Sequence, residues 1–266
     1  MFKVKINLVH SYFKYLIYAK HFSGHGIHSP FIFDFVTKVL FVKEKKYLYN
    51  ELNSYRRGLS RNAQTLEIED KGAGSNQFKS TKRRIKDIIK KSSSSPKYGK
   101  LLARIVAYYQ PEISIELGTS LGIGTSYLAV NLQINSKLYT IEGDYSLYKI
   151  SKLYFDHKFG NIVCPFYGGF DQILPELLNN IDKIDLIFFD GNHRKEPTIR
   201  YFELCLEKIN NQTIFIFDDI HWSKEMEEAW EYIKSHPKTR VCIDLFQMGL
   251  VFFRKELSCE NFIIRF

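Results

Sequence analysis

The stretch ISIELGTSLGIG, residues 113–124, decides how the chain folds. Its apolar run Ile113–Leu117 is followed directly by Gly118, and two further glycines stand at Gly122 and Gly124. Short apolar runs bounded by glycine are typical of buried strands, and glycine tolerates the positive φ angles of a tight turn. The stretch therefore predicts a strand, a glycine turn and the start of a helix.

The rest of residues 96–266 continues the alternation of strand and helix. Further strands are expected at residues 137–142, 161–165, 185–189, 213–217, 241–246 and 249–254, with helices at 96–109, 197–208 and 223–234 among those that separate them. Apolar runs such as LIFF and IFIF indicate parallel strands buried on both faces. Because only a short link separates the last two strands, they should pair as an antiparallel hairpin. The prediction is a doubly wound α/β fold with a mostly parallel seven-stranded sheet ending in that hairpin.

Residues 1–95 form a separate N-terminal extension that is expected to be mostly helical. It begins with the basic and aromatic segment MFKVKINLVHSYFKYLIYAKH, which predicts an amphipathic helix. Docking on the parent domain or on a second subunit, giving a homodimer, is favoured over membrane contact. A basic helix is expected at residues 82–91, and the extension can serve as a lid or an oligomer contact. His25 and His28 are interpreted as parts of a structured turn rather than as ligands.

Composition narrows the class of protein. With 266 residues, 45% of them hydrophobic, the chain is too apolar to be disordered. Its four cysteines lie far apart with no CxxC pair, so neither a zinc site nor a disulfide framework is expected and a cytoplasmic location is predicted. No apolar run is long enough for a transmembrane helix. The net charge of +9 favours an anionic partner, such as an acidic substrate, a nucleic acid or an anionic membrane surface.

The glycine spacing indicates a nucleotide-type cofactor. It fits neither the GxGxxG pattern of dinucleotide folds nor the GxxxxGK[ST] pattern of P-loops. Free N–H groups at the start of the following helix suit the carboxylate of a methionine moiety. The strand LYTIE ends at Glu142, about two dozen residues beyond Gly118, where a carboxylate can accept both ribose hydroxyls. Together these features predict a site for S-adenosylmethionine.

From about Pro96 to Arg254 the chain resembles the catechol, caffeoyl-type and sugar O-methyltransferases of the class I S-adenosylmethionine-dependent superfamily. The stretches that carry the resemblance are PKYGKLLARIV, ISIELGTSLGIGTSYLA, LYTIEGD, YGGFDQILPEL, DLIFFDGNH and IFIFDDIHW. The resemblance implies a Rossmann-like methyltransferase domain in residues 96–266. It also implies that Glu142 holds the ribose and that Phe170 and Asp171 flank the adenine. The full expected cofactor set is Glu116, Gly118, Thr119, Gly122, Gly124, Glu142, Gly143, Phe170, Asp171 and Asp190.

Three carboxylates follow two neighbouring strands. Asp190 follows one, and Asp218 and Asp219 follow the next. Because the carboxyl ends of parallel strands open into one crevice, these groups should repel one another unless a cation lies between them. Oxygen ligands suit Mg²⁺ or a similar divalent cation, and the resembling enzymes bind their metal at such positions. Helix capping or pairing with lysine and arginine remains the alternative.

Two histidines are candidate bases. His193 stands three positions after Asp190, where the catechol-type enzymes carry a lysine. Imidazole titrates near neutral pH and can remove a hydroxyl proton during methyl transfer. His221, just after the acidic pair, can take the same role or bind substrate, so the expected catalytic set is His193, Asp190 and His221. A plain packing or hydrogen-bonding role stays open for either histidine.

The preferred hypothesis is an enzyme that methylates the hydroxyl of a small-molecule acceptor, with S-adenosylmethionine as donor and a divalent metal assisting. A nucleic-acid methyltransferase is the first alternative, supported by the basic clusters 82–84 and 90–91. Against it, no Asn/Asp-Pro-Pro-Tyr/Phe motif follows the fourth strand. A non-catalytic scaffold that binds the cofactor is the second alternative. A catechol, a sugar hydroxyl, a lipid-linked group and a carboxylate would all suit the same crevice, so the sequence does not select the acceptor.

Overall fold

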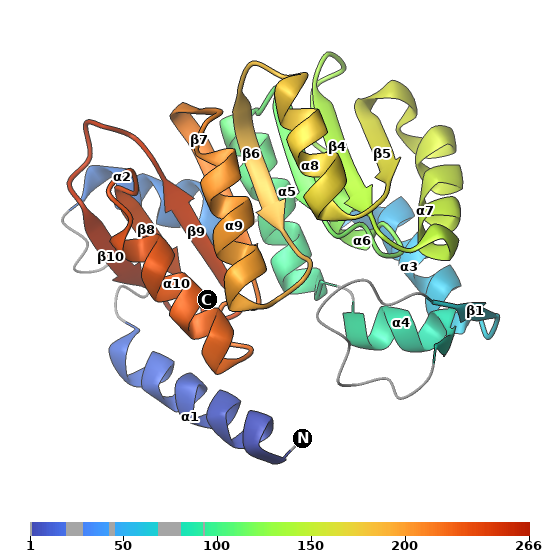
Figure 1. Ribbon diagram of the computed structural model, residues 1–266, viewed down its shortest axis with the longest axis horizontal. Coiled ribbons are helices and arrows are strands. Elements are labelled where there is room, and N and C mark those ends of the chain that lie inside the picture. The colour runs from blue at the N-terminus through green and yellow to red at the C-terminus, as the bar shows by residue number, and fades with distance from the viewer. Residues whose placement is uncertain (1, 20–28, 43–45, 69–80, 93) are drawn as a thin grey trace. The chain divides into compact units, whose positions relative to one another are not determined.

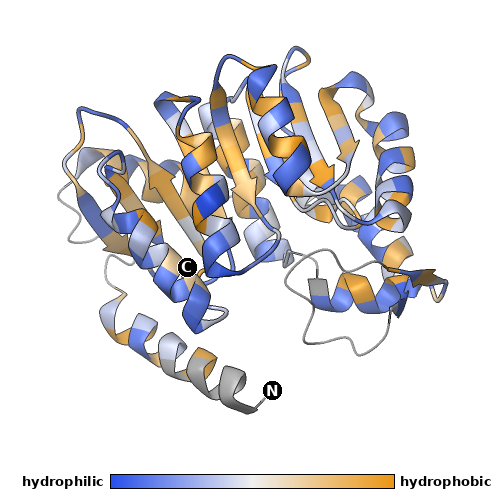
Figure 2. Ribbon diagram, viewed as in Figure 1, coloured by the Kyte–Doolittle hydropathy of each residue, from blue (hydrophilic) through white to orange (hydrophobic). Residues whose placement is uncertain are grey.

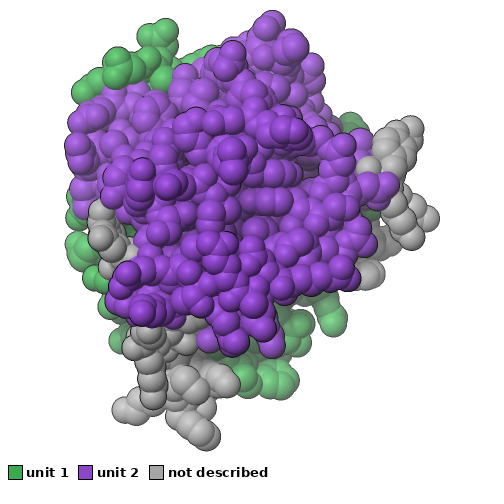
Figure 3. Space-filling view, turned by 90° about the vertical axis from the view of Figure 1, so that its right-hand side faces the viewer, with its two compact units in different colours: residues 1–41, 178–266 green, residues 42–177 purple. Residues whose placement is uncertain are grey.

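The structure is a computed structural model that describes residues 2–19, 29–42, 46–68, 81–92 and 94–266. The chain divides into two compact units, which Figure 3 distinguishes by colour. Unit 1 contains residues 1–41 and 178–266, and unit 2 contains residues 42–177. The expected turn residues His25 and His28 lie outside the described residues.

Unit 2 is built on three parallel strands in the order β3-β4-β5. The strands span Ile113–Leu117, Lys137–Glu142 and Val163–Tyr167, and the helices that connect or flank them are α5 (Pro96–Tyr109), α6 (Ile123–Ala129), α7 (Tyr145–Lys158) and α8 (Phe170–Asn179, whose last residues fall in unit 1). The 3₁₀ turn η4 (Gly160–Ile162) precedes β5. Ser95 caps α5 by accepting the N–H of Tyr98, and Pro96 occupies the first turn. Both features are strong helix-start signals, so the expected helix at 96–109 is confirmed residue for residue.

The part of the extension that belongs to unit 2 is mixed rather than wholly helical. It contains η3 (Lys46–Tyr49), α3 (Asn50–Arg61), β1 (Thr65–Glu67), β2 (Lys82–Arg84) and α4 (Ile85–Ser92). The prediction of a helix from residue 82 is wrong for its first three residues, because β2 pairs antiparallel with β1. Ile68 N donates to Thr81 O at 2.8 Å, which continues that ladder. The pairing joins segments about 17 residues apart, and a local basic pattern does not reveal such a partner.

Unit 1 holds five strands in the order β10-β8-β9-β7-β6. They span β6 (Ile184–Phe189), β7 (Ile209–Asp218), β8 (Val241–Asp244), β9 (Met248–Phe252) and β10 (Glu260–Ile263). Strands β6 and β7 are parallel, and β8 and β9 form the expected antiparallel hairpin. Strand β10 pairs parallel with β8 and was not predicted, so the main strands number eight rather than seven among the described residues. Its exposed, polar start lacks the apolar run that marks the others.

Helices cover the unit 1 strands. Helices α9 (Lys195–Cys205) and α10 (Lys224–Ser235) lie on one face, and α2 (Pro30–Phe35), which continues as the π-helical turn η2 (Val36–Leu40), lies on the other (Figure 1). Phe35 packs edge-on against Phe252 of β9, with ring centroids 5.9 Å apart. On the opposite face Trp230 packs against Phe217 at 6.2 Å. In Figure 2 the central strands of unit 1 are mostly orange, and the helices that cover them carry both orange and blue residues.

The first helix, α1 (Phe2–Tyr18), packs beside the C-terminal end of the chain in unit 1. The hydroxyl of Tyr15 donates to Ile264 O at 2.7 Å and accepts the N–H of Phe266 at 3.0 Å. Among the described residues, no helix is both long and apolar enough to cross a membrane. The architecture is the doubly wound, mostly parallel α/β fold that the sequence predicts.

Candidate active site

The glycine loop of unit 2 adopts the expected strand–turn–helix form. Gly118 has φ 109° and Gly122 has φ 76°, values that side-chain-bearing residues rarely adopt. A Cβ on Gly122 would lie 2.6 Å from Cζ of Phe155, so the close approach of α7 also requires glycine. The N–H groups of Gly118 and Thr119 donate to Ile141 O at 3.1 and 3.3 Å, which ties the loop to the end of β4.

Glu142, at the end of β4, is bound to the loop by its side chain. Its Oε2 accepts the N–H of Ser120 at 2.7 Å, and its Oε1 accepts the N–H of Asp144 at 2.8 Å. Burial raises the pKa of Glu142, and these two N–H donors oppose the rise. Each oxygen keeps a further lone pair, so the carboxylate is held in place and can still accept hydrogen bonds from a ligand.

Glu116, in β3, is a fully buried carboxyl with one unsatisfied oxygen. Its Oε2 accepts the hydroxyls of Thr125 at 2.5 Å and Thr140 at 2.6 Å, while its Oε1 is buried without a partner. Burial raises the pKa of Glu116 to about 8, and the two hydroxyls oppose that rise. A buried acceptor without a donor is costly, so Oε1 is suited to a cationic or N–H-bearing ligand group.

The remaining expected cofactor residues of unit 2 lie at the same ends of the strands. Gly143 follows β4, and Phe170 and Asp171 open α8 after β5. The N–H of Gly168 donates to Glu142 O at 3.0 Å, which joins the segment before α8 to the end of β4. Phe170 is half-buried and Asp171 is exposed. Nine of the ten expected residues belong to unit 2, and the tenth, Asp190, belongs to unit 1.

A residue that the sequence did not single out also supports the loop. Tyr55 of α3 donates its hydroxyl to Leu121 O, inside the glycine loop, at 2.9 Å. Its ring lies parallel to that of Tyr154 of α7, with centroids 3.6 Å apart and planes 1° apart. Burial raises the pKa of the Tyr55 hydroxyl above its ordinary value. The contact joins residues 66 positions apart, and no local pattern signals it.

Unit 1 brings the three predicted acidic residues together. Asp218 ends β7, Asp219 follows with φ 55°, and Asp190 follows β6, the strand paired with β7. Burial raises the pKa of Asp218 well above its usual range, and the neighbouring Asp219 carboxylate raises it further. Asp218 Oδ1 and Asn192 Oδ1 are buried without a hydrogen-bond partner. Two unsatisfied acceptors at the carboxyl ends of adjacent strands indicate a place for a donor group of a ligand.

The predicted metal site is not supported by this arrangement. No group of three or more His, Cys, Asp or Glu side chains in the described part of the chain is placed to hold a metal ion. Asp190, Asp218 and Asp219 are neighbours but do not converge as such a group.

His193 lies within the acidic group of unit 1. Its Nε2 is 3.9 Å from Asp190 Oδ1. Burial raises the pKa of the nearby Asp219, and His193 opposes that rise. The imidazole is partly exposed, with a side-chain exposure of 24%. His193 therefore combines a neighbouring carboxylate with access to a ligand, which a proton acceptor requires.

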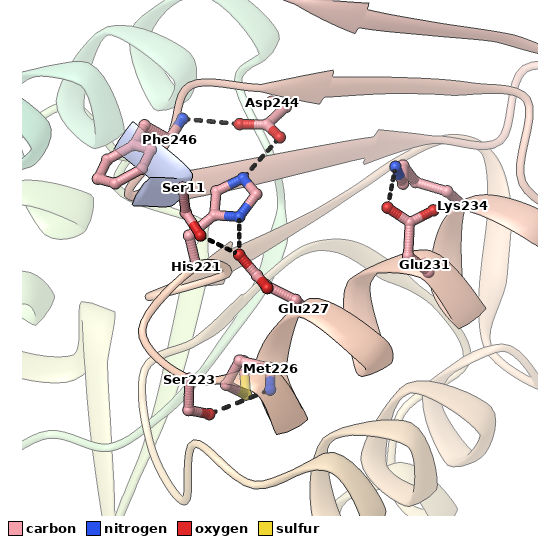
Figure 4. Close-up of polar contacts among 9 residues, drawn as sticks. All are labelled: Ser11, His221, Ser223, Met226, Glu227, Glu231, Lys234, Asp244 and Phe246. Carbon is pink, nitrogen blue, oxygen red and sulfur yellow. Dashed lines mark hydrogen bonds and ion pairs between the residues drawn. The ribbon is translucent and has the colours of Figure 1, made fainter. Parts of the chain in front are cut away.

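His221 has a different environment, shown in Figure 4. Its Nε2 is 2.8 Å from Asp244 Oδ2 and its Nδ1 is 3.2 Å from Glu227 Oε1, while Phe246 stacks on the ring at 5.3 Å. Burial lowers the pKa of His221, but the two carboxylates outweigh it and the net shift is upward. Ser11 of α1 donates to the same Glu227 oxygen at 2.6 Å. With both ring nitrogens engaged, His221 links α1, α10 and β8.

Comparison with known proteins agrees with this fold. Residues 115–220 match the family described as "Methyltransferase domain". The catechol O-methyltransferase of Niastella koreensis is 29% identical over 130 residues, which is 48% of this chain and 58% of that protein. The chain thus spans a little over half the length of this relative.

Two solved structures share the fold at low sequence identity. The O-methyltransferase of Bacillus cereus in complex with S-adenosylhomocysteine is 17% identical, with a TM-score of 0.56 over 82% of this chain and 96% of that one. The O-methyltransferase TomG of Streptomyces achromogenes, in complex with S-adenosylmethionine, is also 17% identical, with a TM-score of 0.58 over 83% and 95%.

The chain shares the fold of these O-methyltransferases, and its residues 115–220 match the methyltransferase-domain family. In sequence and in fold, the chain is similar to O-methyltransferases.

Proposed function

We propose that this protein transfers a methyl group from S-adenosylmethionine to an oxygen atom of a small-molecule acceptor. The observation that carries the proposal is the pairing of Glu142 with the glycine loop through Ser120 N. This bond holds a carboxylate at the end of β4 beside a turn in which Gly118 and Gly122 adopt positive φ angles. The unpaired Oε1 of Glu116 adds an acceptor that no protein group satisfies.

The loop residues of unit 2 would hold the cofactor. Glu142 would accept hydrogen bonds from the ribose hydroxyls, as acidic residues do in related nucleotide folds. Glu116 Oε1 would accept an N–H of the methionine ammonium, which would satisfy its unmatched acceptor. The backbone around Gly118 would lie against the methionine moiety, and Phe170 and Asp171 would border the adenine. Bound in this way, the sulfonium supplies an electrophilic methyl carbon.

His193 would remove the proton of the acceptor hydroxyl. As the acceptor oxygen took the methyl group that the bound sulfonium would supply, the carbon–sulfur electron pair would stay on sulfur and the hydroxyl proton would pass to the imidazole. Asp190, 3.9 Å from His193 Nε2, would favour the imidazolium that results. Such a displacement depends mainly on alignment, so the role of the chain is to hold acceptor and donor in line.

The acceptor itself would bind through hydroxyl groups. The unpaired oxygens Asp218 Oδ1 and Asn192 Oδ1 can each accept one hydroxyl hydrogen. A substrate with two neighbouring hydroxyls, such as a catechol or a sugar, would donate one hydrogen bond to each of these two oxygens. The chain has 38 Lys and Arg but only 29 Asp and Glu, and this positive net charge favours a substrate that also carries negative charge.

The test has two stages. Calorimetry with S-adenosylmethionine should show saturable binding to the wild-type chain and none to Gly118→Arg, which would fill the loop. Methyl transfer from radiolabelled donor is then measured on catechols, sugars, carboxylates and RNA. Incorporation into RNA with salt-sensitive binding would favour the nucleic-acid alternative, whereas cofactor binding without any transfer would favour the scaffold alternative.

Metal assistance remains a prediction with its own test. Loss of activity in EDTA and its recovery with Mg²⁺ would support a site at Asp190, Asp218 and Asp219. Unchanged activity in EDTA, together with full activity of Asp218→Asn, would contradict the prediction of a metal-assisted reaction.

A further inference from the structure

Helix α1 presents two faces with different environments. Its inner face is attached to unit 1 by Tyr15, whose side chain is 5% exposed and whose hydroxyl contacts the backbone of Ile264 and Phe266. Ser11, four positions earlier, donates to Glu227 of α10 on the same side (Figure 4). These contacts fix how the helix is rotated about its own axis.

The outer face is an exposed apolar stripe. Val9, Phe13 and Ile17 recur every four residues and are 55%, 60% and 75% exposed. Tyr12 is 46% exposed but packs edge-on against Phe246 at 4.9 Å, so it lies on the side of α1 that contacts the rest of unit 1. Side chains at i, i+4 and i+8 lie on one side of a helix, so the three form a continuous surface. A soluble monomer rarely exposes such a stripe, and exposed apolar patches mark interaction surfaces.

The charge of α1 distinguishes between two candidate binding partners of this surface, a second copy of the chain and a lipid bilayer. The sequence of the helix contains Lys3, Lys5 and Lys14 and no Asp or Glu. If two copies of the chain paired through α1, two helices whose sequences carry lysine and no acidic residue would meet, and like charges repel. An anionic lipid surface complements both the apolar stripe and the lysines, and the net charge of +9 on the whole chain adds to the attraction.

We propose that α1 docks by its outer face on an anionic lipid bilayer, with the helix lying in the plane of the interface. Phe13 and Ile17 enter the acyl boundary, and Lys14, which is exposed, reaches the lipid headgroups. A helix of 17 residues is marginal in isolation, but the contacts of Tyr15 and Ser11 already hold α1 folded against unit 1. Lipid binding therefore requires little additional ordering of the chain. This inference is independent of the proposed methyl transfer.

Flotation of the full chain with vesicles tests the proposal. Vesicles of phosphatidylcholine alone are compared with vesicles of equal parts phosphatidylcholine and phosphatidylglycerol. The wild-type chain should float with the anionic vesicles only, and added salt should weaken binding. The double variant Phe13→Ser, Ile17→Ser should bind at least about tenfold more weakly, and Lys14→Glu should also bind more weakly. Leu153→Ser is the matched control because Leu153 is likewise 75% exposed but lies on α7, and it should bind as wild type.

Circular dichroism melts of each variant check that the fold is intact, which is expected because the substituted side chains project outward. Absence of flotation with anionic vesicles would overturn the proposal. So would a dimer in sedimentation velocity that the Phe13→Ser, Ile17→Ser variant loses while no variant binds lipid, because the occupant would then be a second copy of the chain.

Discussion

Tyr55→Phe tests how the N-terminal extension supports the glycine loop, residues 118–124. It removes one hydroxyl and leaves the ring that stacks on Tyr154 at 3.6 Å. The loss is the 2.9 Å hydrogen bond from Tyr55 to the carbonyl of Leu121. The loop then keeps its glycine turns and its bond to Glu142 but loses its attachment to α3.

The structure gives the size of the effect. A hydrogen bond of this kind contributes about 0.5–1.5 kcal/mol, and a buried carbonyl left without its donor costs about 1–3 kcal/mol. Leu121 is fully buried, so the free energy of unfolding should fall by about 1–3 kcal/mol. For a chain of about this size each kcal/mol lowers the melting temperature by roughly 2–4 °C. Tyr55→Ala also removes the stacked ring and should cost about 3–5 kcal/mol.

The assay combines thermal melting with calorimetry of S-adenosylhomocysteine binding. Tyr55→Phe should melt lower than wild type and bind the ligand more weakly, because a less restrained loop must be ordered on binding. Tyr108→Phe is the control, since Tyr108 is 41% exposed on α5 of the same unit. If Tyr55→Phe matched Tyr108→Phe in both measurements, the hydroxyl would not support the loop and the reasoning would fail.

The other predictions concern the loop, the buried carboxyl and the base. Gly122→Ala should lower the free energy of unfolding by about 2–5 kcal/mol in urea titrations, because the new Cβ would combine a positive φ with a 2.6 Å contact to Phe155. Stability should fall as pH rises from 4.5, the ordinary pKa of Glu116, to about 8, its pKa when folded. Over that range the Glu116 carboxyl keeps its proton in the folded chain and has lost it in the unfolded chain. The melting temperature of Glu116→Gln should therefore lack this part of the pH dependence. Glu142→Gln should weaken S-adenosylhomocysteine binding in calorimetry by about tenfold or more, through loss of a charge-assisted hydrogen bond to ribose. His193→Ala should lower kcat by about 10²–10⁴-fold with S-adenosylhomocysteine affinity retained, and an unchanged kcat would remove His193 as the base.

Much of the fold follows from local sequence because its signals are local. Ser95 and Pro96 start α5 at the predicted residue, and the glycines of residues 118–124 specify the turn after β3. Apolar runs fix the buried strands β6 and β7 for the same reason. Each of these features depends on backbone preference or on burial of a few consecutive side chains, so neighbouring residues carry the information.

Features that depend on distant partners were missed or left open. Strand β10 is short and starts with exposed residues, and it becomes a strand only because β8 offers it an edge. Strand β2 lies inside a basic stretch that continues as a helix, and its pairing with β1 decides its conformation. The position of Tyr55 on the cofactor loop similarly requires α3 and α7 to pack together.

The sequence alone predicts the alternation of strands and helices, the glycine loop and the place of Glu142 at the end of a strand. Glycine spacing and strand-end residues are local signals, so each segment carries its own information. The surroundings of the two candidate histidines, in contrast, depend on tertiary packing. His193 lies 3.9 Å from the Asp190 carboxylate, whereas both ring nitrogens of His221 contact carboxylates, those of Asp244 and Glu227, at hydrogen-bonding distance. The difference arises because the carboxylates around each histidine include residues distant in sequence, which come together only when strands and helices pack. These contacts decide which ring nitrogens remain available for a reaction.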